Sequence, residues 1–397
     1  MTPGDQPLRI GMLTPLSTGP LTHLLDDPPA DLPAGIGGPG PTDLIAALAA
    51  AGHHVTAISL SPEAAAPVRA RGTHLDLRLL PMREEHRGRD AYGPERKALR
   101  AELDGLDVDV VHAQWTYEYA LTAHHATVPY VVTVRDWTPQ VLRYNFIPYW
   151  LVKLGMNAVV LGRRPHLTTP SPSVLRRLGR LGFRNVRHIP NGLQIQDMAV
   201  DRPREAPKDP PVLLSVTNEF SGRKNTGALL QAFAIIRRRH PAAELLMIGN
   251  EHGPGDEAAR WATERGLHVG VQFLGEQSRS EVVAAMDGAD LLVHPAREEP
   301  FGIVVIEAMS RGLPVVGGTR AGGVPFILDG GAAGELVDVD DPESIVAGIL
   351  TLLGNRSRYA ECSTVGLQRV TEEFDVSRLA ELYVRAYRDA MAGRWVR

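Results

Sequence analysis

The sequence has little that could anchor it covalently or in a membrane. Cys362 is the single cysteine, so an intrachain disulfide is excluded and a reducing compartment fits. No apolar run approaches the length of a membrane span, and residues 1–9 lack the charged and apolar segments of a secretory signal. The formal net charge of −4 gives no reason to expect general nucleic-acid binding. We therefore expect a cytoplasmic protein.

The chain is long enough for two domains. Its 397 residues exceed what one ordinary core organises, and 44% hydrophobic with 22% charged residues describe a globular protein. Between residues 193 and 211 the apolar rhythm stops, and residues 201–211 form a charged, proline-rich stretch typical of a stiff linker. We predict a first domain over residues 1–200, a second over 201–375 and a final helical segment over 376–397.

Both halves alternate apolar strands with helices. Strands are predicted in the first half at residues 8–13, 55–60, 75–80, 107–112, 129–134 and 186–189. The second half has strands predicted at residues 212–216, 244–248, 271–274, 290–293 and 314–316. Helices are predicted at residues 42–51, 92–106, 174–181, 225–240, 256–265, 280–287 and 374–395. This alternation is typical of α/β domains with parallel sheets.

Polar residues follow two predicted strands of the first half. His112 ends one strand, and Arg135 with Asp136 follows the next. Ligands of parallel sheets bind outside the carboxyl ends of the strands, so these three side chains are candidates for a binding cleft. The alternative for His112 is a hydrogen-bonded histidine packed beneath a loop.

A long loop rich in glycine and proline, residues 14–41, separates the first strand from the first helix. It includes Gly37 and Gly38, where a backbone could approach a phosphate closely, although the G-x-G-x-x-G spacing of a dinucleotide site is absent. The length of the loop favours a segment that covers a substrate over a simple connection.

Residues 144–161 are aromatic and apolar, with Lys153 and Asn157 as interruptions. A helix packed on the sheet is the favoured interpretation. A helix lying on a membrane surface and a wall for a greasy acceptor are the alternatives.

The segment 298–309 organises the second half. Gly302 permits close backbone approach, and the helix that starts at Ile303 offers unpaired N–H groups that suit a phosphate. Glu299 precedes this start, and Glu307 lies about 12 Å beyond Glu299 if the interval is helical. A nucleoside-diphosphate sugar, with hydroxyls at both ends and phosphates between, would use all of these groups. Arg223 and Lys224, which follow another strand, suit the diphosphate.

Several motifs in fixed order resemble the retaining glycosyltransferases of family 4, the group 1 enzymes with the GT-B fold. They are Asp109–His112, Ile189–Gly192, Lys224 before Ala232-Phe233, His294-Pro295 before Glu299-x7-Glu307, Gly312–Val316 and Gly322–Pro325. The resemblance implies an acceptor-binding and a nucleotide-sugar-binding Rossmann-like domain that face a central cleft. It also implies that the last helix crosses back to the first domain.

The resemblance also implies roles for individual residues. Glu299, with the backbone near Phe301 and Gly302, would bind the donor sugar, and Glu307 would bind the ribose. The remaining donor contacts would come from Lys224 at the diphosphate, Asn218 nearby, Leu274 and Glu276 at the base, and the Gly37-Gly38 loop over the phosphates. His112 and Asp136 would line the acceptor side.

Three positions depart from the family pattern. Glu219 stands where the family usually has an arginine, five residues before Lys224. Arg135 replaces the usual histidine before Asp136, and Gln194 replaces the usual aspartate after the Asn-Gly-Leu segment. Arg223 is the candidate to replace the missing arginine. We interpret these departures as signs of an unusual acceptor or donor.

We therefore predict retaining, metal-independent transfer of a sugar from a UDP- or GDP-linked donor to a hydroxyl or amine. The acceptor is expected to be a small metabolite, a natural-product intermediate or a lipid-linked molecule, and no cofactor is expected. A nucleotide-sugar epimerase or hydrolase, and an impaired nucleotide-binding partner subunit, are the alternatives.

Overall fold

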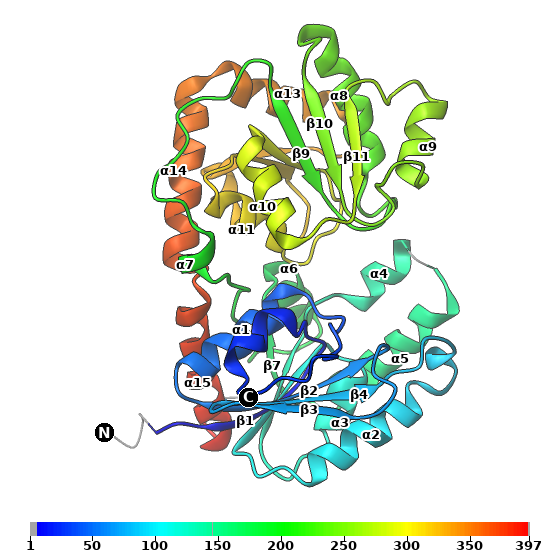
Figure 1. Ribbon diagram of the computed structural model, residues 1–397, viewed down its shortest axis with the longest axis vertical. Helices are drawn as coiled ribbons and strands as arrows, with labels where there is room; N and C mark the ends of the chain where they lie inside the picture. Colours follow the sequence, from blue (N-terminus) through cyan, green and yellow to red (C-terminus); the bar gives the residue numbers. More distant parts are fainter. Residues whose placement is uncertain (1–5, 145, 396–397) are drawn as a thin grey trace. The chain divides into compact units, whose positions relative to one another are not determined.

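The computed structural model describes residues 6–144 and 146–395. The chain forms two compact units, Met1–Gln194 together with Val376–Arg397, and Ile195–Asp375 (Figure 1). The boundary predicted after residue 200 lies inside the second unit. Val200 N–H donates to Ser310 O at 2.9 Å, and Arg311 Nη1 donates to Met198 O at 2.7 Å, so residues 195–200 are held by the second unit.

The first unit is built on a sheet with the strand order β3-β4-β2-β1-β5-β6-β7-β8. Its strands are β1 (Arg9–Leu13), β2 (His54–Ser61), β3 (Val68–Arg71), β4 (Leu75–Pro81), β5 (Val110–Gln114), β6 (Tyr130–Thr133), β7 (His166–Thr169) and β8 (Arg187–His188). All pair in parallel except β3, which runs antiparallel to β4. The prediction had no strand at β3, because a four-residue edge strand with two arginines has no apolar run.

Helices pack on this sheet, and Ile10, Val110 and Val131 belong to one of the two hydrophobic clusters of the unit. The helices are η1 (Gly19–Leu24), α1 (Pro39–Ala50), η2 (Arg87–Asp90), α2 (Gly93–Asp104), α3 (Glu118–Ala123), α4 (Thr138–Tyr144), α5 (Pro148–Gly162), α6 (Pro172–Arg180) and α15 (Val376–Met391). Tyr383 and Tyr387 of α15 are buried in the same cluster as Ile10. The last helix is therefore part of the first unit's core.

Three local predictions need correction. The loop 14–41 is not wholly irregular, since it contains η1. Helix α1 begins at Pro39 and not at residue 42, because Thr42 Oγ1 lies inside the first turn and donates to Gly38 O at 3.2 Å. The apolar segment 144–161 is split into the end of α4 and α5, and α5 packs against the unit through Met156 and Val160.

The second unit has a sheet of order β11-β10-β9-β12-β13-β14 in which every described pairing is parallel. Its strands are β9 (Val212–Val216), β10 (Glu244–Ile248), β11 (Val271–Gly275), β12 (Leu291–His294), β13 (Val315–Gly318) and β14 (Gly334–Val337). Its helices are α7 (Ile195–Met198), α8 (Thr226–Arg239), α9 (Glu257–Glu264), α10 (Arg279–Gly288), α11 (Ile303–Ser310), α12 (Val324–Ile327), η3 (Asp329–Gly331), α13 (Pro342–Gly354) and α14 (Arg356–Glu373). The predicted fold class, two parallel-sheet α/β domains, is confirmed. Within the described ranges, no helix combines the length and the apolarity needed to cross a membrane.

Candidate active site

In the first unit, the carboxyl ends of β5 and β6 bring polar side chains together. The two strands pair in parallel, with Gln114 opposite Thr133, so the residues that follow them leave the same edge of the sheet. Trp115, directly after β5, has a φ of 65°, a left-handed conformation that bulky residues rarely adopt. Such strain is found at ligand sites more often than elsewhere, so this edge of the sheet is a candidate ligand site.

His112 is fully buried inside β5 and has partners on both ring nitrogens. Its Nδ1 lies 2.7 Å from Tyr387 Oη, and its Nε2 lies 2.7 Å from Thr133 Oγ1 and 3.3 Å from Gln114 Nε2. Burial, and then the charge of Arg135, lower the pKa of His112 to about 3, so the ring is neutral near pH 7. The contacts observed within the unit hold the strand end, and a catalytic role for His112 stays a prediction.

Arg135 is buried with neutral partners. Its side chain is 9% exposed, Nε donates to Gln114 Oε1 at 2.7 Å, and Nη1 donates to Asn191 Oδ1 at 2.8 Å. The guanidinium lies 5.2 Å from the centre of the Trp115 ring. Burial lowers the pKa of Arg135 to about 10, which still leaves the group charged at neutral pH. The neighbouring Asp136 accepts a hydrogen bond from Tyr117 Oη at 2.8 Å.

The glycine loop before α1 contains two kinds of glycine. A Cβ on Gly37 would lie 2.1 Å from Leu16 Cα, so packing within the loop already requires glycine there. Gly38 caps α1 without a side-chain bond, and a Cβ placed on it would meet no atom within 4 Å. The open space at Gly38 leaves its backbone accessible to a ligand.

In the second unit, the start of α11 is open as predicted. Gly302 is the N-cap with a φ of 103°, and no side chain caps the helix. The preceding segment is fixed by Gly323, whose N–H donates to Glu299 O at 2.8 Å. A Cβ on Gly322 would lie 2.1 Å from the same carbonyl oxygen, so the Gly322-Gly323 pair lets two loops touch.

Glu299 and Lys224 form a mostly buried ion pair beside that helix start. Lys224 Nζ lies 2.9 Å from Glu299 Oε2, and the two side chains are 13% and 16% exposed. His294 Nε2 lies 3.6 Å from the same oxygen. Burial by itself would raise the pKa of Glu299, but Lys224 and His294 outweigh it and hold the pKa well below its usual range. Glu299 is therefore an ionised acceptor of hydrogen bonds.

Arg223, the candidate replacement for the family arginine, is bound to Glu219. Its Nε and Nη2 donate to Glu219 Oε1 at 2.9 and 2.5 Å. Glu219 has a φ of 66°, so the segment after β9 is strained as the one after β5 is. Glu219, which departs from the family pattern, thus holds Arg223 beside Lys224 and offsets part of the positive charge of Arg223.

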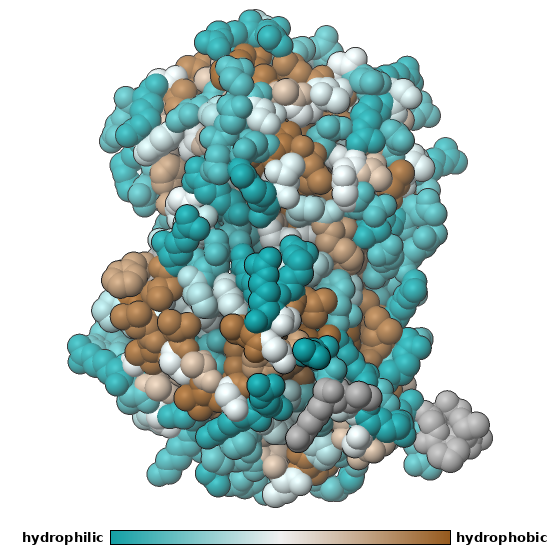
Figure 2. All heavy atoms as spheres, turned by 180° about the vertical axis from the view of Figure 1, so that it is seen from behind, coloured by the Kyte–Doolittle hydropathy of each residue, from teal (hydrophilic) through white to brown (hydrophobic). Residues whose placement is uncertain are grey.

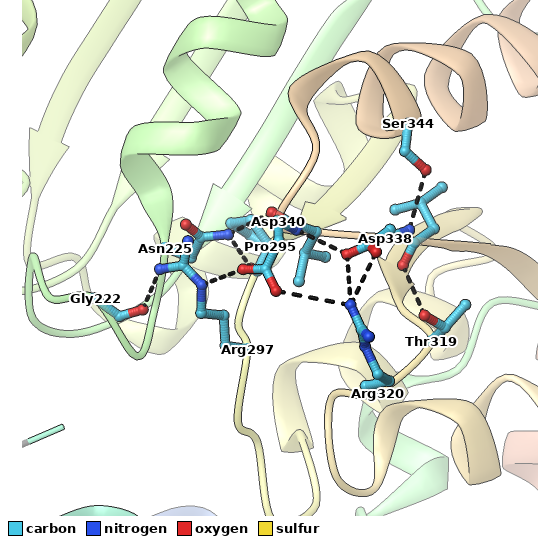
Figure 3. Close-up of polar contacts among 11 residues, drawn as sticks. Gly222, Asn225, Pro295, Arg297, Thr319, Arg320, Asp338, Asp340 and Ser344 are labelled. Carbon is cyan, nitrogen blue, oxygen red and sulfur yellow. Dashed lines mark hydrogen bonds and ion pairs between the residues drawn. The ribbon is translucent and has the colours of Figure 1, made fainter. Parts of the chain in front are cut away.

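The loop that carries Lys224 is fixed by a polar network (Figure 3). Asn225 Nδ2 donates to Pro295 O at 3.2 Å and to Val339 O at 2.6 Å. Arg297 Nη1 donates to Gly222 O at 2.6 Å, and its Nε bonds the Asp340 carboxylate. These contacts tie the loop after β9 to the loops after β12 and β14, which fixes the backbone on both sides of Lys224.

The other predicted donor residues lie around the same sheet edge. Asn218 follows β9 and accepts from Asn250 N–H at 3.1 Å. Leu274 is in β11, and Glu276 follows it and is exposed. Phe301 is buried against Phe374. Glu307 is half-buried and lies in the second turn of α11, which begins at Ile303.

Sequence reasoning did not select several residues that complete the two sites. In the first unit these are Gln114, Tyr117 and Asn191, the partners of Arg135 and Asp136. In the second it is His294, the neighbour of Glu299. Gln114 is the polar last residue of the apolar strand β5, which was an available signal. Asn191 and His294 lie within motifs named above but had been given no role, and Tyr117 is recognisable only through its contacts.

Two Asp-x-Asp segments occur in the chain, and arginines engage their carboxylates. Asp107 and Asp109 are both bound by Arg9. Asp340 is bound by Arg297, and Asp338 accepts from Arg320 Nη2 at 2.8 Å (Figure 3). These acidic pairs are therefore used within the fold.

Two family models match the chain in tandem. The model described as Glycosyltransferase Family 4 matches residues 42–197, and Glycosyl transferases group 1 matches residues 198–369. The two matches meet three residues after Gln194, where the first compact unit passes into the second.

Named relatives support the same grouping. D-inositol 3-phosphate glycosyltransferase of Corynebacterium jeikeium is 38% identical over 133 residues, 31% of this chain and 32% of that protein. Phosphatidyl-myo-inositol mannosyltransferase of Mycobacterium tuberculosis is 30% identical over 214 residues, 52% of this chain and 54% of that protein. The aligned part thus spans from about a third to about half the length of these curated relatives.

A solved structure shares the fold over nearly the whole chain. Sucrose-phosphate synthase from Thermosynechococcus elongatus superposes with a TM-score of 0.77 at 21% identity and covers 97% of this chain and 100% of that one. This likeness confirms the predicted GT-B fold.

Proposed function

Because the chain belongs to the group 1 glycosyltransferases of family 4, we propose that it transfers a sugar from a nucleoside-diphosphate donor to an acceptor hydroxyl or amine, with retention of anomeric configuration. The observation that carries the proposal is the Lys224–Glu299 pair beside the uncapped start of α11. A cation, an ionised carboxylate and free helix N–H groups are the three partners that a sugar diphosphate requires.

Each group has a distinct task in this proposal. Glu299 accepts hydrogen bonds from the donor sugar's hydroxyls and, because its pKa is held low, stays ionised in mildly acidic solution. Lys224 and the N–H groups at the start of α11 meet the diphosphate. Glu307 accepts from the ribose hydroxyls. The base is proposed to lie near Leu274 and Glu276, and the donor to be linked to UDP or GDP.

The chemical step breaks the bond between the sugar's anomeric carbon and the diphosphate oxygen. Negative charge grows on the diphosphate as the bond breaks, and Lys224 with the helix start stabilises it. One preorganised donor of this kind is worth roughly 3–4 kcal/mol. The acceptor attacks from the face that the diphosphate leaves, as the family resemblance implies, and its proton passes to the departing phosphate.

Transfer without a metal ion is part of the proposal. Lys224 supplies the positive charge that the diphosphate needs. The Asp-x-Asp carboxylates, which could otherwise hold a cation, are engaged by Arg9, Arg297 and Arg320. Full activity in the presence of a chelator is the expected result.

The acceptor is proposed to be a polyhydroxylated small molecule, free or linked to a lipid. The relatives named above act on D-inositol 3-phosphate and on phosphatidyl-myo-inositol by their names. The lipid-linked form is favoured by the exposed apolar side chains at the start of α5. Phe146 and Ile147, just before the helix, are 78% and about half exposed, and Leu151 within it is about half exposed. Figure 2 shows hydrophobic atoms at the lower left of this face, the side on which α5 lies.

A thermal-shift screen of UDP, GDP and their sugar derivatives tests the proposal before the acceptor is identified. We expect one nucleotide series to raise the melting temperature and Lys224→Met to remove the shift. No shift with any nucleotide would refute the donor site. Two rival functions give different results: an epimerase or hydrolase converts the donor without any acceptor, and an impaired subunit binds it without turnover.

A further inference from the structure

The guanidinium of Arg135 is a buried charge without a carboxylate. Its assigned hydrogen bonds go to the amide oxygens of Gln114 and Asn191, and the face of Trp115 covers it. No ion pair joins Arg135 to an acidic residue within residues 6–144 and 146–395. The nearby carboxylate of Asp136 accepts from Tyr117. Burying a charge is costly unless an opposite charge compensates it, so the fold alone does not account for this arginine.

One end of the guanidinium is available to a ligand. Two of its five N–H groups have assigned partners, and none is assigned to Nη2. Some polar side-chain atoms of the described residues are fully buried and lack a hydrogen-bond partner, but Arg135 Nη2 is not one of them. Nη2 is therefore reached by solvent, while Nε and Nη1 are fixed from behind by Gln114 and Asn191.

The orientation of Gln114 is set by a relay through the core. Gln114 Nε2 lies 3.3 Å from His112 Nε2. Because this contact holds the amide nitrogen, the amide oxygen of Gln114 points to Arg135 Nε. His112 is held in turn by Tyr387 of α15 at 2.7 Å. This places His112 as a positioning residue, which acts on Arg135 through Gln114.

We propose that Arg135 binds a phosphate group of the acceptor. The inference rests on the proposed function, because it assigns the acceptor to the first unit while Lys224 and α11 of the second unit serve the donor's phosphates. The planar guanidinium of Arg135 is held at Nε and Nη1, so its remaining N–H groups point in a fixed direction. Such a fixed pair of N–H donors matches the oxygens of a phosphate. The phosphate is carried either by a soluble sugar or polyol phosphate or by a phospholipid headgroup.

The test compares anion binding by the full-length chain and three variants. Calorimetry with inorganic phosphate and with inositol 3-phosphate is expected to show binding to the wild type that weakens roughly thirtyfold or more in Arg135→Gln, the effect of removing one partner of a buried charge pair. Arg176→Gln, an exposed arginine on α6, is the matched control and is expected to bind as the wild type does.

Gln114→Glu separates a binding role from a structural one. The new carboxylate would stand 2.7 Å from Arg135 Nε and neutralise it from within the fold. We expect the melting temperature of this variant to rise and its phosphate binding to fall together. Phosphate binding that is unchanged in both Gln114→Glu and Arg135→Gln, or that is undetectable in the wild type, would overturn the inference.

Further binding measurements distinguish a lipid headgroup from a soluble phosphate. They also distinguish failure of the Arg135 inference from failure of the proposed function. Vesicles containing phosphatidylinositol, compared with phosphatidylcholine vesicles, identify a headgroup if they compete with inositol 3-phosphate, and a soluble acceptor if they do not. Either source supports the inference provided that Arg135→Gln weakens the binding as stated above. Binding of UDP or GDP is measured separately: nucleotide binding without phosphate binding contradicts the Arg135 inference alone, and the absence of nucleotide binding contradicts the proposed function.

Discussion

Lys224→Met is the substitution whose consequences the structure specifies most fully. Lys224 and Glu299 are 2.9 Å apart and keep only 13% and 16% of their side-chain surfaces exposed. Removing the lysine leaves a mostly buried carboxylate with His294 as its neighbour. Loss of one partner of a buried pair costs about 3–5 kcal/mol, and the residual exposure places this pair at the low end, about 3 kcal/mol.

The double variant isolates the origin of that cost. Glu299→Gln in the Lys224→Met background removes the orphaned charge, so we expect the free energy of unfolding to recover by about 2 kcal/mol relative to Lys224→Met. Both variants are expected to lose binding of the nucleoside-diphosphate sugar, because both lack the cation. Chemical denaturation and calorimetry measure the two effects independently.

The pH dependence provides a second readout. Glu299 has a folded-state pKa below its unfolded value, so its contribution to stability is present above the unfolded pKa and is lost as pH falls through the folded pKa. The wild type is therefore expected to lose stability as pH falls below about 4. Lys224→Met is expected to lose less over that window. If Lys224→Met is as stable as the wild type at pH 7 and its stability falls as steeply in acid, the ion pair does not stabilise the fold.

Four further substitutions test other residues predicted to bind the donor. Glu219→Gln releases Arg223 from its carboxylate and is expected to tighten nucleoside-diphosphate binding about fivefold, close to 1 kcal/mol; weaker binding would give Glu219 a contact of its own. Glu307→Ala is expected to weaken nucleotide binding about tenfold or more by leaving the ribose hydroxyls unpaired, and unchanged calorimetry would remove Glu307 from the site. Gly37→Ala should destabilise the fold because its Cβ would meet Leu16, whereas Gly38→Ala should melt normally and weaken donor binding; equal melting temperatures would contradict the assignment.

The fold was predictable where the chain repeats a simple local pattern. The strand from Val212 to Val216 is where its apolar run placed it. Errors arose where a side chain has two possible partners. Thr42 has the chemistry of a helix cap, yet its hydroxyl accepts from Ser17 N–H and donates to Gly38 O, so the helix starts three residues earlier.

The sites were predictable as residue types but not as contacts. Glu299 and Lys224 were assigned to the sugar and the diphosphate separately, and their pairing across 75 residues of chain was invisible in the sequence. His112 lies 275 residues from Tyr387, so its burial depends on the last helix. The family resemblance placed that helix on the first domain, but periodicity alone could not place it beside His112. Long-range pairing of this kind is a property of tertiary packing, whereas periodicity reports only the neighbourhood of each residue.

The two departures from the family pattern at Glu219 and Arg135 are related by charge. Glu219 stands in the second unit where the family usually has a cation, and it binds Arg223. In the proposed function this pair lowers the positive charge available to the donor's diphosphate. Arg135 replaces a histidine with a permanent cation in the first unit, where it has no acidic partner among the described residues. The proposed acceptor, which carries its own phosphate, would account for this change, since that phosphate needs a cation on the acceptor side. A weaker clamp on the donor would also limit misplacement of the acceptor's phosphate in the diphosphate site, because an anion partitions between two sites according to their charge. Restoring a cation with Glu219→Arg should therefore raise the affinity of the donor side for inositol 3-phosphate, which competition against UDP or GDP would detect.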